Sequence, residues 1–210
     1  MTVEASTIYL LDVPSGEAVE AELRDAIEEK QLIDWQTQWQ PALIAVLQQL
    51  AQRHVPIADW PQSWHWNWRT KMAQVHGLLA FQGFSVVCAD VTQGLMRVDL
   101  TKFARVPAED GKPLVFVDYL EVAPWNRPEL GHAPRYRGVG TALVTAAVAL
   151  SEQEGFKGRI GLHSLPQADA FYRDRCCMTD LGPDSSCQNL RYFEMTPEQA
   201  RKFLEEESES

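Results

Sequence analysis

The stretch Arg135-Tyr-Arg-Gly138-Val-Gly140-Thr141 decides how the chain is interpreted, because it stands between a predicted strand and a predicted helix. Two glycines separated by one residue let the backbone come close to an anion and adopt conformations with φ > 0. At the N-terminus of a helix, free N–H groups and the positive end of the dipole favour a phosphate. Arg135 and Arg137 would add charge-assisted contacts. The stretch therefore predicts a phosphate-binding turn.

Three kinds of phosphate loop compete for this stretch. A Walker A loop needs G-x-x-x-x-G-K-[ST], and the sequence contains no such run. A dinucleotide fingerprint needs a third Gly or Ala where this chain has Leu143, and it normally lies in the first strand–helix unit. The third kind has the pattern Arg135-x-x-Gly138-x-Gly140, and it fits.

This third pattern resembles the pyrophosphate-binding motif of the GNAT superfamily, the acyl-CoA-dependent N-acyltransferases. Leu120-Glu-Val-Ala-Pro124 resembles the strand end before that motif, and Arg159–Leu165 resembles the strand that follows it. Ala168-Asp-Ala-Phe171-Tyr172 resembles the family's A-x-x-F-Y helix, and the order agrees with the family across residues 114–195. The resemblance implies an α/β fold (α+β by some schemes). Its mixed, mainly antiparallel central sheet is flanked by helices, and a splayed parallel strand pair holds CoA.

The resemblance also implies a cofactor site, with acetyl-CoA as co-substrate and no metal. Backbone groups of Leu120 and Val122 would hold the pantetheine. The turn itself would bind the pyrophosphate, through Arg135, Tyr136, Arg137, Gly138, Val139, Gly140 and Thr141. The amine would attack the thioester directly, without a covalent enzyme intermediate.

Such a reaction needs two proton movements. A protonated amine, with a pKa near ~10, must lose a proton before it attacks, and the departing thiolate benefits from a proton donor. Tyr172 matches the family's frequent donor position. For the base, Glu121 and Asp118 both stand on the predicted strand, on opposite faces if the strand alternates regularly, and Glu121 is favoured. His163 lies in a predicted buried strand and is interpreted as a core histidine.

Two segments depart from the family pattern. Trp125–Pro134 is an apparent insertion beside the cofactor, which either shapes the acceptor or acyl pocket or forms only a surface loop. Cys176-Cys177-Met178 replaces the family's Gly-Phe after the F-Y helix. Cys176, Cys177 and Cys187 could hold a metal, but buried or reduced thiols are the favoured interpretation.

Six of the seven tryptophans lie between Trp35 and Trp68. In Trp60-Pro-Gln-Ser-Trp64-His-Trp66-Asn-Trp68, a helix that begins at Ser63 would place Trp64 and Trp68 on one face. Two interpretations stay open. The indoles pack a helix against the sheet, or they form a wall of the acceptor pocket, where an indole face attracts a cationic amine.

Hydrophobic periodicity and turn residues give the other elements. The first half of the chain predicts a strand at Ile8–Val13, helices at Glu17–Lys30, Pro41–Arg53 and Ser63–Ala80, and a hairpin of Phe84–Asp90 with Leu95–Ala104 joined by Val91–Gly94. The second half predicts a strand–helix–strand crossover, made of Leu114–Val122, Arg137–Glu154 and Arg159–Leu165. It is followed by a short helix Ala168–Arg175, a strand Leu190–Met195 and a terminal helix, which begins at the capping box Thr196-Pro-Glu-Gln199.

A single domain over residues 1–210 is expected. Its divergent half, 1–106, would form the acceptor side, 107–195 the acyl-CoA-binding half, and 196–210 a C-terminal helix and acidic tail.

The formal net charge of −10 argues against a nucleic-acid partner, because phosphate backbones need clustered Lys and Arg, and it suits a cationic amine. No signal-peptide pattern is evident, and no apolar run reaches the ~20 residues that span a bilayer. The four cysteines show no disulfide-framework spacing. We therefore expect a cytoplasmic protein with no membrane partner, and a homodimer stays open.

Together these features predict an N-acyltransferase that moves an acetyl group from acetyl-CoA to a primary amine of a small molecule, peptide or protein. The alternative is a catalytically silent CoA-binding module, regulatory or protein-binding, on the same fold. A GNAT toxin that acts on charged tRNA would suit a basic surface, and the net charge of −10 disfavours it.

Overall fold

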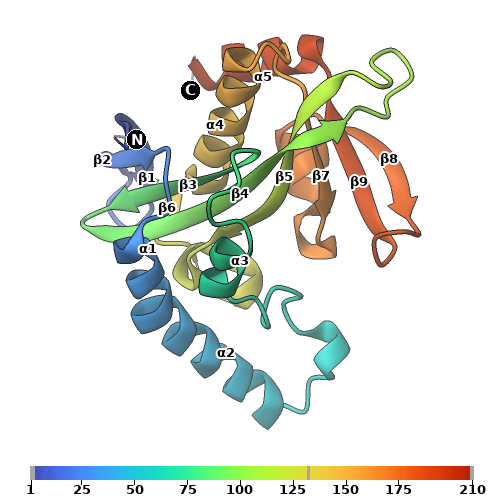
Figure 1. Cartoon of the computed structure of the whole chain (residues 1–210). Helices are drawn as coiled ribbons and strands as arrows, with labels where there is room; N and C mark the ends of the chain where they lie inside the picture. The colour runs from blue at the N-terminus through green and yellow to red at the C-terminus, as the bar shows by residue number, and fades with distance from the viewer. Residues whose placement is uncertain (1–2, 132, 209–210) are drawn as a thin grey trace. The chain divides into compact units, whose positions relative to one another are not determined.

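The strands of the chain form one mixed, mainly antiparallel sheet. The structure is a computed structural model that describes residues 3–131 and 133–208 (Figure 1). Within these residues, hydrogen bonding orders nine strands as β6-β1-β2-β3-β4-β5-β7-β9-β8. The pair β5–β7 is parallel, whereas the pairs β1–β2, β1–β6, β2–β3, β7–β9 and β8–β9 are antiparallel. The fold class expected from the sequence is confirmed.

The chain divides into two compact units, which are described in turn. The first unit comprises Met1–Leu78, Gly83–Met96 and Leu120–Leu143, and the second comprises Leu79–Gln82, Arg97–Tyr119 and Val144–Ser210. Strands β4 (Val91–Phe103) and β5 (Pro113–Val122) and helix α4 (Val139–Gln153) contribute residues to both.

In the first unit, β1 (Ala5–Asp12) and β2 (Glu17–Arg24) form an antiparallel hairpin with Tyr9 opposite Glu20. The predicted strand at Ile8–Val13 is confirmed, but the predicted helix Glu17–Lys30 is wrong. Apolar Val19, Ala21 and Leu23 alternate with polar and small residues at period two, which is typical of a strand half-buried against a neighbour. Its many charged residues had favoured a helix.

The helices of the first unit are α1 (Glu29–Asp34), α2 (Gln40–Gln52) and α3 (Trp68–Gln74). A π-helical turn, Trp35–Trp39, joins α1 to α2, and Figure 1 shows the two as one continuous helical stretch. The helix predicted from Pro41 is confirmed. The helix predicted over Ser63–Ala80 is much shorter, because Asn67 caps α3 by accepting a hydrogen bond from the Thr70 N–H at 3.0 Å.

Strand β3 (Phe81–Cys88) is followed in the chain by β4, and the connecting turn lies earlier than predicted. Ala89 and Asp90 form it, with φ angles of 50° and 60°. Two successive positive φ values are typical of the two-residue turn that matches strand twist. Val91–Gly94, predicted as the turn, therefore belongs to β4.

In the second unit, β5 and β7 (Ile160–Ser164) are parallel, with Val115 opposite Ile160, so the predicted crossover is confirmed. β7 then pairs with β9 (Leu190–Met195), which pairs with β8 (Thr179–Asp184). β8 was not predicted, because Gly182-Pro183 is typical of a loop, and the ladder is irregular between Asp180 and Pro183.

Helix ends in the second half follow local chemistry. Helix α5 (Pro197–Ser208) begins at the predicted capping box: Gln199 N–H donates to Thr196 Oγ1 at 3.3 Å, and Thr196 N–H donates to Gln199 Oε1 at 2.9 Å. The predicted short helix Ala168–Arg175 is a 3₁₀ turn, Pro166–Ala168, followed by a π-helical turn, Phe171–Arg175.

Candidate functional site

The glycine turn sits at the junction of a short strand and a helix. Strand β6 (Tyr136–Arg137) pairs with β1, so α4 begins at Val139 and not at Arg137 as predicted. Gly138 lies between them with a φ of +97°, a conformation that L side chains rarely adopt. The first helical bond runs from Ala142 N–H to the Gly138 carbonyl at 2.8 Å. The preceding N–H groups, from Val139 to Thr141, have no partner within the helix and point outward from its N-terminus.

Gly94 of β4 lets the first turn of α4 approach the strands. A Cβ atom at Gly94 would lie 2.6 Å from Val139 Cγ1, 3.0 Å from Leu143 Cδ1 and 3.8 Å from the Glu121 carbonyl oxygen. The missing side chain therefore lets the first turn of α4 lie close to the backbone of β4. An isolated glycine within a strand is a signal of such close approach.

Arg135 makes an ion pair at the base of the turn. Its Nε donates to Asp12 Oδ1 at 2.8 Å, and its guanidinium lies 5.2 Å from the Tyr136 ring centroid. Ser15 donates a second hydrogen bond to Asp12 at 2.8 Å. The Ser15 hydroxyl and then the Arg135 guanidinium hold the pKa of Asp12 below its usual range. The Arg135 side chain is still 55% exposed, so the rest of its guanidinium remains available to an anion.

The segment Trp125–Pro134 is held in place by buried polar contacts. Trp125 Nε1 and Asn126 Nδ2 both donate to Gln93 Oε1, at 2.8 and 3.0 Å. Asn126 Oδ1 accepts the backbone N–H of Tyr136 at 2.9 Å, and Arg135 N–H donates to the Trp125 carbonyl at 3.0 Å. The insertion is therefore tied to β4 on one side and to the glycine turn on the other.

A second residue of the insertion, Arg127, enters a buried polar cluster with Glu121. Arg127 Nη1 lies 3.5 Å from Glu121 Oε1 and donates to Ser63 Oγ at 3.1 Å. Trp68 Nε1 donates to Glu121 Oε2 at 2.6 Å, and the Trp68 side chain is 0% exposed. Glu121 therefore connects the insertion with the tryptophan-rich segment.

Glu121 is buried, with only 7% of its surface exposed. Burial raises the pKa of this carboxyl, and the nearby charge of Arg127 and the hydrogen bond from Trp68 only partly oppose the rise. A raised pKa makes the carboxylate of a Glu residue more basic. Its position is fixed by two donors, so its geometry is well defined.

The other tryptophans of the segment have separate partners. Lys71 Nζ lies 4.6 Å from the Trp66 ring centroid, a cation–π arrangement. Trp60 and Trp64 meet edge to face at 5.9 Å, and Trp64 is 43% exposed. Trp64 and Trp68 do not share a helical face, because the helix begins only at Trp68.

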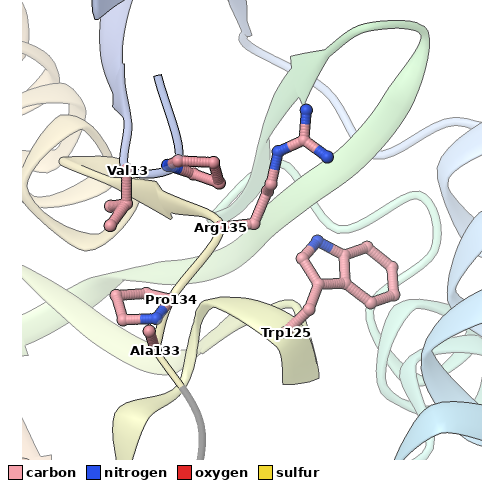
Figure 2. Close-up of a pocket in the computed structure, with 6 residues that line it drawn as sticks. Val13, Trp125, Ala133, Pro134 and Arg135 are labelled. Carbon is pink, nitrogen blue, oxygen red and sulfur yellow. The ribbon is translucent and has the colours of Figure 1, made fainter. Parts of the chain in front are cut away.

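Next to the turn lies a pocket of about 340 Å³. Its lining comes from the turn between β1 and β2, from both ends of the insertion and from the residue after it: Val13, Pro14, Trp125, Ala133, Pro134 and Arg135. Figure 2 shows the Trp125 indole and the Arg135 guanidinium extending on one side, with Val13, Ala133 and Pro134 on the other. The pocket thus offers an aromatic face and a cation beside the glycine turn.

The strand that precedes the turn has few parallel contacts. The parallel register joins Val115–Val117 to Ile160–Leu162, whereas β5 runs on to Val122. Leu120 and Val122, the expected pantetheine-binding residues, belong to this further part of β5 and are half-buried.

Tyr172 lies in the second unit, in the π-helical turn after β7, and it is buried. Its ring packs against Phe171 at 5.1 Å and Phe193 at 6.1 Å between centroids. Burial, and secondarily the neighbouring Cys176 thiol, raise the pKa of this phenol well above its usual range.

Asp118, the other carboxyl considered for the base, is ion-paired in the second unit. Arg97 Nε donates to Asp118 Oδ2 at 2.9 Å, and a second Arg97 nitrogen contacts the same oxygen. The Arg97 guanidinium also lies 4.8 Å from the Tyr119 ring centroid. This carboxylate is thus fixed by a buried arginine.

The cysteines differ in environment, and none belongs to a metal cluster in the described part of the chain. Within residues 3–131 and 133–208, no three His, Cys, Asp or Glu side chains are arranged to hold a metal ion. Cys176 is buried, and burial raises the pKa of its thiol to about 12. Cys177 is exposed and Cys187 half-buried.

The first unit brings most of the predicted site residues together, namely Leu120, Glu121, Val122 and the turn Arg135–Thr141, whereas Tyr172 belongs to the second unit. Sequence reasoning missed Gly94, Asn126 and Arg127. Gly94 had a recognisable signal, as a glycine within a β-rich run. Asn126 and Arg127 had none, because their partners Gln93 and Ser63 are distant in sequence.

Comparisons with known proteins give similarity of fold. No family model matches the sequence, and no curated protein matches it. The PaiA N-acetyltransferase from Thermoplasma acidophilum, solved with coenzyme A, is 9% identical with a TM-score of 0.48, over 93% of this chain and 99% of that one. The N-acetyltransferase YlbP from Bacillus subtilis, also with coenzyme A, is 12% identical with a TM-score of 0.48, over 94% and 98%.

A structure described as a KacTA–DNA complex is 18% identical with a TM-score of 0.47, over 66% of this chain and 84% of that one. These similarities concern the fold alone. Among the described residues, no helix combines the length and apolar character needed to cross a membrane.

Proposed function

We propose that the chain is an acyl-CoA-dependent N-acyltransferase that transfers an acetyl group from acetyl-CoA to a primary amine. The observation that carries this proposal is the turn at Gly138. Gly138 has a φ of +97°, helix α4 begins at the next residue, and Arg135 directly precedes β6, so that together they form a cradle for a diphosphate. The motif is also the one by which the sequence resembles the family.

The fit of CoA to these residues rests on the chemistry of each part. The N–H groups of Val139, Gly140 and Thr141 would bind the pyrophosphate, together with the exposed guanidinium of Arg135. The pocket formed with Trp125 offers an indole face for a base and the same guanidinium for a further phosphate. Backbone groups of Leu120 and Val122 would hold the pantetheine arm.

The chain's own side chains then supply the proton movements. We assign Tyr172 as the donor to the departing thiolate, because it matches the family's frequent donor position and a phenol is protonated at neutral pH. We assign Glu121 as the carboxylate base, because burial raises its pKa and so makes the carboxylate more basic, while Trp68 and Arg127 hold its two oxygens. General acid–base catalysis of this kind contributes roughly 10²–10⁴-fold to a rate.

The proposal is tested by calorimetric titration of the protein with acetyl-CoA and with free CoA. We expect micromolar binding to the wild type and none to Gly138→Glu, because a charged side chain then occupies the cradle. Gly77→Glu is the matched control. Its φ is +77° and no atom lies within 4 Å of an added Cβ, so it carries the same backbone strain outside the site.

A catalytically silent CoA-binding module is the second candidate function. The same titration followed by a thiol-release assay with a panel of amines separates the two. Binding with thiol release for at least one amine supports the enzyme. Binding without release for any amine favours the silent module, and absence of binding to either ligand excludes both.

A further inference from the structure

Strand β1 of the first unit has an open edge. The sheet order places β1 between β2 and β6, but β6 pairs only with Leu11 and Asp12 at the end of β1. Over residues 5–10, none of the described strands lies on the side of β1 that faces away from β2. A strand edge of this kind presents N–H and C=O groups to any chain that can add a further strand.

The register with β2 identifies the backbone groups on this edge. Asp25 N–H donates to the Glu4 carbonyl oxygen at 3.1 Å, so Glu4 belongs to a hydrogen-bonded pair with β2's side of the hairpin. Such pairs alternate with non-bonded pairs along antiparallel strands. In β1, residues 6, 8 and 10 therefore bond to β2, whereas Ala5, Thr7 and Tyr9 direct their N–H and C=O groups outward.

This edge lacks the features that prevent outer strands from pairing. Native edges are protected by charged side chains, prolines or bulges. Residues 5–11 include no charged residue, proline or glycine, and their register with β2 is unbroken. At the other end of the strand order, β8 contains Gly182-Pro183 and two aspartates, and its ladder with β9 is irregular. One outer strand is thus protected, whereas β1 remains able to pair.

The side chains of β1 also leave one row uncovered. Tyr9 is 69% exposed and Leu11 is 39% exposed. Both share a face with Thr7, because side chains alternate along a strand, and on the opposite face Leu10 is buried. A strand added beside β1 would pack its side chains against the exposed row, and such cross-strand pairs stabilise sheets.

The outward groups of β1 are complementary to those of a second β1. In an antiparallel pair with a two-fold axis at Thr7, each Thr7 lies opposite the other, and each Tyr9 lies opposite the small Ala5. Each of these pairs exchanges both N–H···O bonds, so all the outward groups are satisfied. A shift by two residues puts Tyr9 opposite Val3, outside β1, or Ala5 opposite Leu11, which β6 already occupies.

The charge distribution favours the same partner. The net charge of −10 makes two copies repel each other wherever acidic side chains meet. The glutamates nearest this edge are Glu20 and Glu22 of β2, which lie opposite Tyr9 and Thr7. Two paired β1 strands would place the two β2 strands about 14 Å apart, at three strand spacings. This exceeds the Debye length of about 8 Å at physiological ionic strength, so the repulsion is screened.

We propose that the chain forms a homodimer in which β1 pairs antiparallel with β1 of a second copy, about a two-fold axis at Thr7. The two sheets then become one continuous sheet, and the pairing ends where β6 occupies the edge at Leu11. This dimer depends neither on CoA binding nor on acyl transfer, so it stands or falls separately from the proposed function.

A charge exchange at Thr7 tests both the dimer and its register, with sedimentation equilibrium over a series of protein concentrations. We expect the wild type to approach twice the mass of one chain. Thr7→Lys and Thr7→Glu each put like charges opposite each other, so each alone should be monomeric. An equimolar mixture of the two should restore the dimer, because opposite charges then face each other.

Tyr9→Lys mixed with Tyr9→Glu is the matched control for this exchange. In the proposed register Tyr9 lies opposite Ala5, and the two Tyr9 residues are about 13 Å apart along the strands. Mixing should therefore have little effect at this position. Restoration at Tyr9 and not at Thr7 would overturn the proposed register.

Thr7→Pro tests the backbone pairing itself. Proline removes an N–H that points outward, so the bonds between β1 and β2 are kept, and outer strands tolerate proline at such positions. We expect the dimer dissociation constant to rise roughly 10-fold or more, whereas the control Thr7→Val, which keeps the N–H, should dimerise as the wild type does. Unchanged calorimetric binding of CoA and an unchanged unfolding midpoint would show that Thr7→Pro is folded.

Three results would refute the dimer. They are a wild type that is monomeric at every concentration, dimerisation unaffected by Thr7→Pro, and a monomeric wild type whose β1 amides are protected from hydrogen exchange only by an added extended peptide. The last result would assign the edge to a foreign strand. Failure of the wild type to bind CoA would refute the proposed function and leave the dimer untouched.

Discussion

Gly94 shows how one missing side chain can position a binding turn. A Cβ there would lie 2.6 Å from Val139 Cγ1, closer than real Cβ contacts allow, and Val139 is the first residue of α4. Interiors are packed so tightly that one added methyl group forces neighbours to move. The group displaced here belongs to the same helix turn whose N–H groups we propose as pyrophosphate ligands.

We therefore expect Gly94→Ala to lower the free energy of unfolding by about 1–3 kcal/mol and to weaken CoA binding. Urea denaturation and calorimetry measure the two effects. The double variant Gly94→Ala with Val139→Ala removes the clashing methyl group, so it should lose less stability than the two single losses added together. If the double variant instead loses as much stability as the two single variants together, the contact between the added methyl group and Val139 is unimportant.

Among the elements, the insertion Trp125–Pro134 has more structural consequence than its loop composition suggests. Asn126 donates to Gln93 of β4 and accepts from Tyr136 N–H, so one side chain connects two neighbouring elements. Buried polar groups with satisfied partners specify a geometry, and each lost partner leaves an unsatisfied group. The insertion thereby fixes where the glycine turn begins.

Replacement of Asn126 by alanine should lower stability by about 1–3 kcal/mol and reduce CoA affinity, because Tyr136 N–H loses its acceptor and the turn is less well ordered. Denaturant unfolding and calorimetry check both. Glu129→Ala is the control from the same insertion. Its carboxylate is 36% exposed where it pairs with Arg127, so this pair should contribute only about 0–1 kcal/mol. Equal losses in the two variants would contradict the role given to Asn126.

Elements whose pattern is local were predictable from the sequence, and pairings between distant segments were not. Strand β5 is a β-branched and aromatic run, and α5 begins at a capping box, so short windows suffice for both. Strand β2 was missed because its glutamates favour a helix, and only pairing with β1 makes its alternation decisive. The Glu121–Trp68 contact joins residues 53 positions apart, which no local pattern encodes.

In the candidate site, too, features with a local sequence pattern were predictable and contacts between distant segments were not. The Gly138 turn was recognisable because phosphate binding imposes glycine spacing at a helix start. The partners of Glu121 come from segments whose sequences carry no such constraint. Burial raises the pKa of Glu121, so this effect on the predicted carboxylate became visible only once the fold was known.

At the scale of the whole molecule, charge sets how stability depends on pH. The chain has 29 acidic and 19 basic residues, a net charge of −10. General repulsion among exposed charges is screened beyond about 8 Å at physiological ionic strength. Specific carboxylates with shifted pKa values therefore decide the response, and two of them act in opposite directions. Burial raises the pKa of Glu121, whereas arginine contacts lower that of Asp180.

Asp180 predicts acid sensitivity of the hairpin β8–β9. Burial alone would raise its pKa, but hydrogen bonds from Arg191 and Arg173 outweigh this and lower the pKa to about 2. A carboxyl whose pKa is lower in the folded than in the unfolded chain, where it is about 3.9, stabilises the fold above about pH 4. That stabilisation is lost as pH falls through about 2, and it amounts to at most about 2 kcal/mol.

Hydrogen exchange of peptides that cover residues 179–195, measured from pH 2 to 5, tests this expectation after correction for intrinsic exchange rates. The wild type should gain protection as pH rises through this window, and Asp180→Asn should show little change. Glu121 has the opposite sign. Its penalty is absent below the ordinary glutamate pKa of about 4.3 and grows as pH rises toward the raised value, so peptides around residues 121–127 should lose protection over that range. A parallel response of both regions would show that net charge, and not these two carboxyls, governs the pH dependence.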